Sequence, residues 1–131
     1  GVITKAELKL NPMPPARKTI MAVYDDLSKA GESVFRVLEN GVIPGKIELL
    51  DNWVIRRIEE MMPLGLPQEA AAVLLFETDG IPEADEKETE KILEITKKYG
   101  DALDDPPFSG GINCCLNLFA ETPGAINEVR R

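Results

Sequence analysis

The chain of 131 residues carries 23 acidic against 15 basic side chains, and its formal net charge is −8. This balance argues against a nucleic-acid partner, because binding to phosphates needs a concentrated basic patch. No histidine is present, which removes the commonest general base and the commonest metal ligand, so we expect no metal site. The length and the 44% of hydrophobic residues suit one globular domain whose core needs neither disulfide nor metal.

The two cysteines are adjacent in the sequence, at Cys114 and Cys115. Adjacent cysteines bond to each other only through a strained peptide, and they lack the spacing of a zinc knuckle. They therefore indicate reduced thiols in a cytosolic protein. No apolar run approaches the roughly 20 residues that span a bilayer, and the N-terminus has no signal-peptide pattern. We expect a cytoplasmic protein with no membrane span.

The first ten residues, Gly1–Leu10, alternate between apolar and polar side chains, which is typical of a strand. Residues 11–17 include Pro12, Pro14 and Pro15, which fix φ and remove amide donors. This composition predicts a Pro-rich linker. We therefore expect residues 1–10 to belong to a different structural unit, most of which lies outside this sequence.

The stretch from Lys18 to Asp51 predicts a strand, a helix and a second strand. The β-prone run Thr19–Tyr24 opens it and Lys46–Leu50 closes it. Asp26 is expected to cap the start of the helix, and Asn40-Gly41 to end it with a left-handed residue. Apolar residues recur at helical spacing in between, at Leu27, Ala30, Val34, Val37 and Leu38.

A short helix is predicted over Trp53–Met62, with Asp51 or Asn52 as its cap. Trp53 is interpreted as a core or subdomain anchor, with a ligand-facing role as the alternative. The apolar run Ala70–Thr78 predicts a central strand, and Glu83–Tyr99 an outer helix ended by Gly100. The narrow apolar stripe of that helix is expected at Ala84, Ile92, Leu93, Ile95 and Tyr99.

This order of elements predicts an α+β fold, a ferredoxin-like antiparallel sheet with helices packed on one face. A parallel α/β sheet is the alternative, but the short return at Val42–Gly45 favours split βαβ units. Residues 101–131 carry loop signals and give no clear structure.

The residues suited to chemistry are few. Glu48 and Asp51 could act as a pair of carboxylates, but a capping role for Asp51 is simpler. Arg56-Arg57 could bind a carboxylate or phosphate, and surface ion pairing is the alternative. Ser109-Gly110-Gly111 lacks the strand and helix that a phosphate-binding loop needs. Residue patterns alone therefore indicate an α+β domain without a self-sufficient active site.

Several segments, in their order, resemble one family. GVITKAELKL at Gly1–Leu10 is similar to the closing strand of the FAD-binding domain in FAD-linked oxidases of the vanillyl-alcohol-oxidase type. The segments AVYDDLSKAGESV, GVIPGKIELLD (Gly41–Asp51) and LPQEAAAVLLFETDG (Leu66–Gly80) resemble the start of that family's C-terminal, or cap, domain. Within the family, the likeness is to the glycolate oxidase D-subunit and D-lactate dehydrogenase branch.

The resemblance implies a flavin enzyme that oxidises a small D-2-hydroxy acid to the 2-oxo acid by hydride transfer to FAD. In such enzymes the FAD-binding domain holds the cofactor, and the C-terminal domain caps the flavin and shapes the substrate site. Only Gly1, Val2 and Ile3 match a family position at FAD, where the backbone lies against the cofactor. The family's glycine-rich and histidine-containing motifs have no counterpart here, and residues 101–131 do not visibly match.

The domain organisation expected from the resemblance is the last strand of a truncated FAD-binding domain (1–10), a linker (11–17) and an incomplete cap domain (18–131). Such a fragment would be inactive alone, with an FAD-binding domain or subunit as partner and a small 2-hydroxy acid as substrate in the complete enzyme. One alternative is a stand-alone ferredoxin-like binding or oligomerisation module, whose sheet pairs through an exposed edge with itself or with a partner and which senses a small ligand. Another is a structural subunit of an oxidase whose FAD lies on a different chain.

Overall fold

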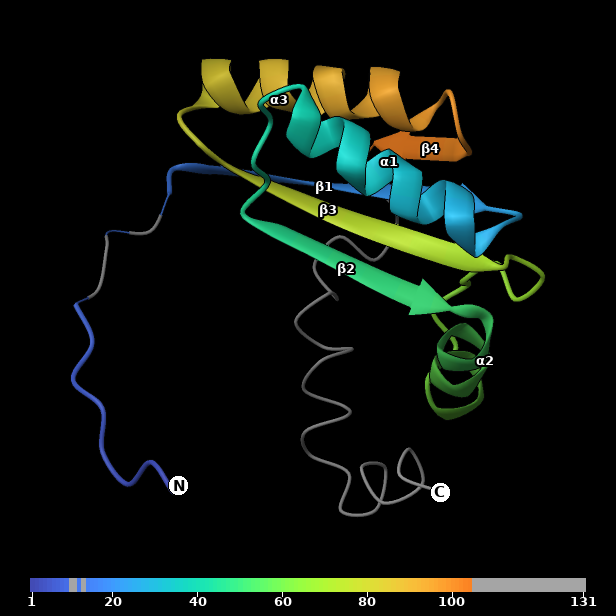
Figure 1. Ribbon diagram of the computed structural model, residues 1–131, viewed down its shortest axis with the longest axis horizontal. Helices are drawn as coiled ribbons and strands as arrows, with labels where there is room; N and C mark the ends of the chain where they lie inside the picture. The colour runs from blue at the N-terminus through green and yellow to red at the C-terminus, as the bar shows by residue number, and fades with distance from the viewer. Residues whose placement is uncertain (10–11, 13, 105–131) are drawn as a thin grey trace.

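The computed structural model describes residues 1–9, 12 and 14–104. Its strands are β1 (Ala16–Tyr24), β2 (Lys46–Asp51), β3 (Ala72–Gly80) and β4 (Asp101–Asp104), and its helices are α1 (Leu27–Glu39), α2 (Asn52–Met61) and α3 (Pro82–Thr96). The strands form one sheet in the order β2-β3-β1-β4, with every neighbouring pair antiparallel. β1 and β2 are therefore parallel to each other with β3 between them, which confirms the predicted ferredoxin-like arrangement (Figure 1).

The capping residues fix the helix ends as the sequence predicts. The Asp26 carboxylate accepts a hydrogen bond from the Ser28 amide at 2.6 Å, and α1 ends at Asn40 with Gly41 at φ 76°. The Asp51 carboxylate accepts from the Val54 amide at 2.9 Å and so caps α2. Because each cap satisfies an amide that the first helical turn leaves free, these positions determine where the helices begin.

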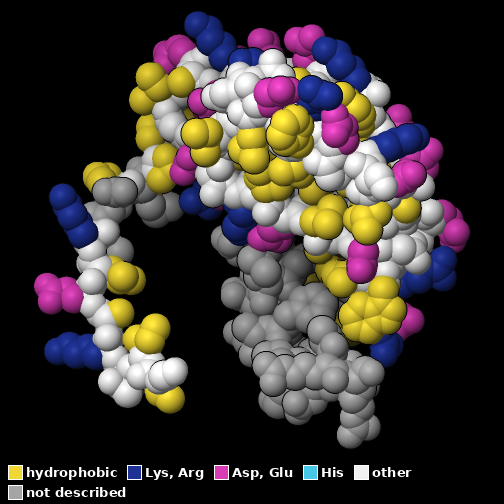
Figure 2. All heavy atoms as spheres, viewed as in Figure 1, with side chains coloured by type: hydrophobic (Ala, Val, Ile, Leu, Met, Phe, Trp, Pro, Cys, Tyr) yellow, Lys and Arg dark blue, Asp and Glu magenta, His cyan; other side chains and the backbone are white. Residues whose placement is uncertain are grey.

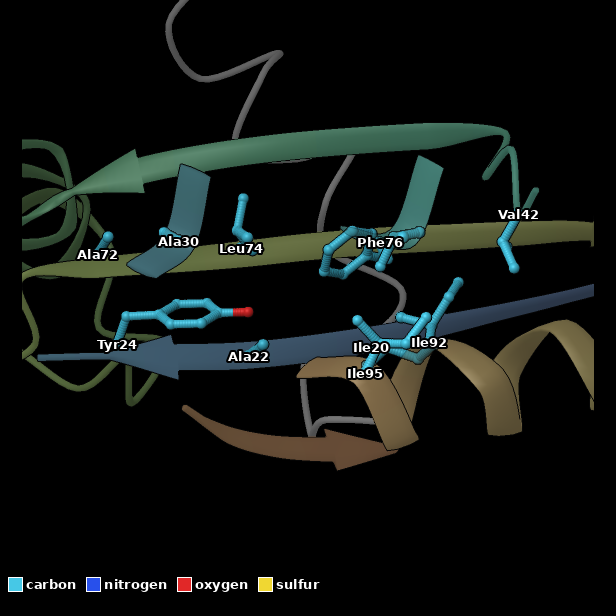
Figure 3. Close-up of a cluster of buried hydrophobic side chains, with 11 residues drawn as sticks. Ile20, Ala22, Tyr24, Ala30, Val42, Ala72, Leu74, Phe76, Ile92 and Ile95 are labelled. Atoms are coloured by element: carbon cyan, nitrogen blue, oxygen red, sulfur yellow. The ribbon is translucent and has the colours of Figure 1, made fainter. Parts of the chain in front are cut away.

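The main core lies between the sheet and the pair of helices α1 and α3, which cover the same face (Figure 1). Alternate residues of β1 and β3 point into it, and Ile92 and Ile95 of α3 meet them (Figure 3). Tyr24 and Phe76 are its largest side chains, at 1% and 0% exposure. Burying a side chain of this size contributes about 1.5–3 kcal/mol.

Helix α2 packs on the opposite face of the sheet, so the helices do not all lie on the one face that the sequence predicts. Its Ile55 and Ile58 cover Met21 of β1 and Leu75 of β3, which alternate with the residues of the main core. The Glu59 carboxylate then accepts hydrogen bonds from the amides of Leu64 and Leu66, at 2.9 and 2.8 Å. This side chain holds the loop between α2 and β3, so the second face also has an ordered apolar cover.

Four apolar positions lie differently from the sequence-based expectation. Leu27 and Leu38 of α1 are 50% and 45% exposed, because Ala30, Ser33 and Val37 form the stripe that α1 buries. Trp53 is 49% exposed, and the Arg57 guanidinium lies 5.7 Å from its ring centroid, so it is not a core anchor. Ala84 is exposed, and Asp85 and Thr89 are buried in its place.

Residues 1–9 have no regular secondary structure and are exposed throughout. Figure 1 shows this segment running away from the sheet. A strand needs a partner to satisfy its backbone groups, and none of the described strands pairs with this segment. Its assignment to the last strand of another domain stays a prediction. The linker is shorter than expected, because β1 already begins at Ala16.

Candidate functional site

A first hollow of about 500 Å³ lies where β1 ends and β4 begins. We call it the Tyr99 hollow. Tyr24 and Asp25 form one wall, Lys29 of α1 and the loop before β3 form the second, and Tyr99 with Asp101 the third. Its lining residues are Val23, Tyr24, Asp25, Lys29, Pro67, Glu69, Ala70, Tyr99, Gly100 and Asp101.

Gly100 makes the close packing at this hollow sterically feasible. A Cβ atom on Gly100 would collide with the Val23 carbonyl oxygen and with the ring of Tyr24. The Tyr24 hydroxyl donates a hydrogen bond to Ser33 Oγ at 2.8 Å, so this polar atom has a partner inside the core. Burial raises the pKa of Tyr24, although the bond to Ser33 acts in the opposite direction.

The Tyr99 hollow is acidic. Three carboxylates line it, those of Asp25, Glu69 and Asp101, against the single ammonium group of Lys29. Lys29 Nζ lies 2.8 Å from Asp25 Oδ1, and this hydrogen bond and charge lower the pKa of Asp25 and raise the pKa of Lys29. The hollow therefore repels anions such as a carboxylate or a phosphate.

A second hollow, of about 410 Å³, lies where β1 begins and α3 begins. We call it the Asp85 hollow. Its charged lining residues are two basic and two acidic ones, Arg17, Lys18, Asp85 and Glu86, so their formal charges sum to zero. Asp85 is 1% exposed, and neither of its carboxylate oxygens has a hydrogen-bond partner among the described residues. Lys18 lies on the face of β1 that carries Ile20 and Ala22, which is the face that α3 covers.

The candidate residues from the sequence have structural roles. Asp51 caps α2, and Glu48 lies 3.4 Å from Lys46 Nζ, so the two carboxylates do not act as a pair. Arg56 and Arg57 contact Glu69 and Glu60 at 3.7 and 2.7 Å. Ser109-Gly110-Gly111 lies outside the described residues. In the described ranges, no group of three or more His, Cys, Asp or Glu side chains could hold a metal ion.

Residues 13–104 match the family described as FAD linked oxidases, C-terminal domain. The chain belongs to this family. It is 38% identical over 100 residues to glycolate oxidase subunit GlcD of Escherichia coli (strain K12), and 41% identical over 103 residues to that of Bacillus subtilis (strain 168). These alignments cover 76% and 79% of this chain but only 20% and 22% of the relatives. The chain thus spans about a fifth of the relatives' length.

The fold has counterparts among solved structures. Two crystal forms of alkyldihydroxyacetonephosphate synthase, P1 and P212121, align with TM-scores of 0.60 and 0.61 at 12% and 11% identity. They cover 71% and 82% of this chain, which amounts to 21% and 23% of theirs. At this identity the likeness concerns the fold alone. The family match also ends at residue 104, so Asp101–Asp104 belongs to the domain as β4, contrary to the expectation of no match after Gly100.

Neither of the two hollows fits FAD by itself. Its pyrophosphate needs cations or a cluster of free amides, whereas the Tyr99 hollow is acidic and the Asp85 hollow is balanced. Val2 and Ile3, expected beside the cofactor, are both 88% exposed. Gly1 is exposed as well, and no described residue lies within 4 Å of a Cβ atom placed on it. Their assignment to FAD stays a prediction, because no described residue forms the rest of a cofactor pocket around them.

The sequence does not predict the role of two residues in the hollows: Asp85, whose buried carboxylate lacks a described partner, and Gly100, which packs against β1. Asp85 could have been found from the spacing of Asp85, Thr89, Ile92 and Thr96, which repeats every three or four residues and places Asp85 on the buried stripe. The sequence predicts Gly100 only as the end of a helix. Its close approach to β1 depends on residues 76 positions apart and leaves no local signal.

Proposed function

We propose that this chain is the cap domain of an FAD-dependent enzyme that oxidises glycolate or D-lactate, both small 2-hydroxy acids, to the 2-oxo acid. The observation that carries the proposal is the identity of 38–41% to glycolate oxidase subunits over 100–103 residues, which is 76–79% of this chain. The cofactor would be held by an accompanying FAD-binding domain or subunit, with the backbone of Gly1, Val2 and Ile3 lying against it. Alone, the chain would not turn over substrate.

The composition supports an enzyme of the cytoplasm, where cysteine thiols are kept reduced. Among the described residues, no helix is long and apolar enough to cross a bilayer. The charges of the two hollows support the proposed division between the domains. The Tyr99 hollow carries three carboxylates and one ammonium group, and the formal charges that line the Asp85 hollow sum to zero, so we propose that groups outside the described residues bind the substrate carboxylate.

The proposal is tested by grafting residues 13–104 into the Escherichia coli subunit in place of its matching segment. We expect the purified graft to carry a flavin absorption band and to reduce an artificial electron acceptor when glycolate or D-lactate is added. The ungrafted 131-residue chain, mixed with FAD, serves as the comparison and should leave the spectrum of free FAD unchanged.

Two measurements on the graft separate folding from function. The flavin content reports whether the cap and the FAD-binding domain fit together, and dye reduction reports turnover. A graft that retains flavin but oxidises neither hydroxy acid contradicts the proposed substrate class. Flavin bound and bleached by substrate in the ungrafted chain contradicts the proposed division between the domains.

A further inference from the structure

The two edges of the sheet differ in how well they are protected. β4 is four residues long with Asp101 and Asp104 at its ends, and such acidic residues discourage pairing. β2 is longer and, among the described strands, has a neighbour on only one side. Its Leu49 is 52% exposed. An unpaired strand edge presents a row of free amides and carbonyls, so its natural partner is another strand.

Exposed apolar side chains gather beside this edge. They are Leu27, Phe35 and Leu38 of α1, Ile43 of the following turn and Leu49 of β2, at 50%, 56%, 45%, 79% and 52% exposure. We call this set the α1/β2 face. Figure 2 shows hydrophobic side chains gathered over α1 and β2 in this view. Contiguous apolar surface of this kind marks an interaction site in a folded domain.

The position of α1 explains why this face is uncovered. α3 lies over β1 and β4, and Lys91 of α3 donates a hydrogen bond to the Asn40 carbonyl at one flank of α1. The opposite flank of α1 carries Leu27 and Leu38 and projects toward β2. No described helix covers that flank, so Leu49, which shares a face of the sheet with Leu74 of the main core, remains half exposed.

We propose that the α1/β2 face is a homodimer interface, in which β2 pairs antiparallel with β2 of a second copy. A two-fold axis through Leu49 would join the two sheets into a continuous sheet of eight strands, with both α1 helices on the same side. Directly opposed residues in antiparallel strands point to the same face. Leu49 would therefore meet Leu49 of the second copy beneath Leu27 and Leu38 of both.

The sequence of β2 selects this register over its neighbours. An axis through Glu48 would place two carboxylates directly opposite each other, which is unfavourable. An axis through Leu50 would pair only residues 49–51 before α2 begins at Asn52. The axis through Leu49 pairs residues 47–51 and opposes no two like charges. A second copy is thus complementary to this edge in strand pairing and in charge.

The first test measures association of the full 131-residue chain by sedimentation equilibrium over a range of concentrations. We expect a monomer–dimer equilibrium, and we expect Leu49→Lys to weaken it by at least about tenfold, because two ammonium groups would meet at the axis. The matched control is Leu103→Lys on β4, where the leucine is also 52% exposed. It should leave association unchanged, and circular dichroism checks that both variants fold.

The second test uses disulfide formation to show which residues of two copies lie close together. Cys114→Ser and Cys115→Ser first remove the native thiols. Opposed residues of paired strands have Cα atoms about 4.5–5.5 Å apart, within disulfide range. Under mild oxidation, Leu49→Cys should form a covalent dimer, and Leu103→Cys should stay monomeric. A chain that is monomeric at every concentration, or equal cross-linking at both positions, overturns the proposal. Neither readout needs flavin, so failure here is separable from failure of the proposed activity.

Discussion

The hydrogen bond between Tyr24 and Ser33 joins β1 to α1 inside the main core, where both side chains are 1% exposed or less. Tyr24→Phe should lower the free energy of unfolding by about 1–3 kcal/mol, because Ser33 keeps a buried hydroxyl without its partner. Urea unfolding at neutral pH measures the effect. The double variant Tyr24→Phe/Ser33→Ala removes both polar groups and should recover part of the loss. A double variant less stable than the sum of its single variants would contradict this account.

The raised pKa of Tyr24 also predicts how stability changes in alkali. In the unfolded chain the phenol ionises near its ordinary pKa of 10.0, whereas in the folded chain burial delays ionisation to higher pH. The unfolded state therefore gains stability first as the pH rises, and the contribution of Tyr24 is full below its ordinary pKa and falls above it. We expect stability to fall more steeply above about pH 10 in the wild type than in Tyr24→Phe. Superimposable pH profiles of the two proteins would rule this out.

Asp85 is the buried polar residue whose side chain lacks a partner among the described residues. Burying a carboxylate without hydrogen bonds is costly, and an apolar residue at such a site is often stabilising. Asp85→Val should raise the free energy of unfolding by about 1–3 kcal/mol. Glu86→Val, at the exposed neighbouring position, is the control and should change stability by about 0.5 kcal/mol or less. Loss of stability in Asp85→Val would show that the carboxylate has a favourable partner, and Lys18, which lines the same hollow, is the candidate.

At the scale of whole elements, two glycines predict opposite effects of the same substitution. Gly100 follows the last turn of α3 and packs against β1, where an added Cβ would collide with the Val23 carbonyl. Gly100→Ala should therefore cost about 1–3 kcal/mol. Gly31 lies within α1 with open space around its Cα, so Gly31→Ala should stabilise the helix by about 0.5–1 kcal/mol. Thermal unfolding of both variants measures the difference, and a shift of the same sign in both would be inconsistent with it.

Local signals in the sequence predicted the elements and their order, because caps and periodicity act over a few residues. Asp26, Asp51 and the apolar run before Thr78 each defined an element within a few residues of its observed bounds. Periodicity identifies the side of a helix that is apolar, but not how much of that side a neighbour covers. Periodicity therefore assigns Leu27 and Leu38 to the apolar stripe of α1, although they are 50% and 45% exposed. The hollows combine segments that are distant in sequence, so no local pattern predicted them.

At the scale of the whole molecule, the folded unit begins with β1 rather than with the first residue. The nine residues from Gly1 to Lys9 are exposed, whereas β1 forms the centre of the sheet together with β3. The family match likewise begins at residue 13. A segment with this alternating pattern would form a strand only where another structural unit offers a partner, which agrees with its proposed place in an FAD-binding domain.

This organisation predicts that deleting residues 1–9 leaves the domain intact. Because the segment buries no side chain, the free energy of unfolding should change by about 0.5 kcal/mol or less. The slope of that free energy against urea concentration should also stay constant, since it follows the surface exposed on unfolding. Ile92→Ala, which empties part of the main core, is the positive control and should cost about 2–5 kcal/mol. A truncated chain that is destabilised, with a smaller slope, would place residues 1–9 against the sheet. An unchanged chain leaves them free to complete a sheet in the proposed FAD-binding domain.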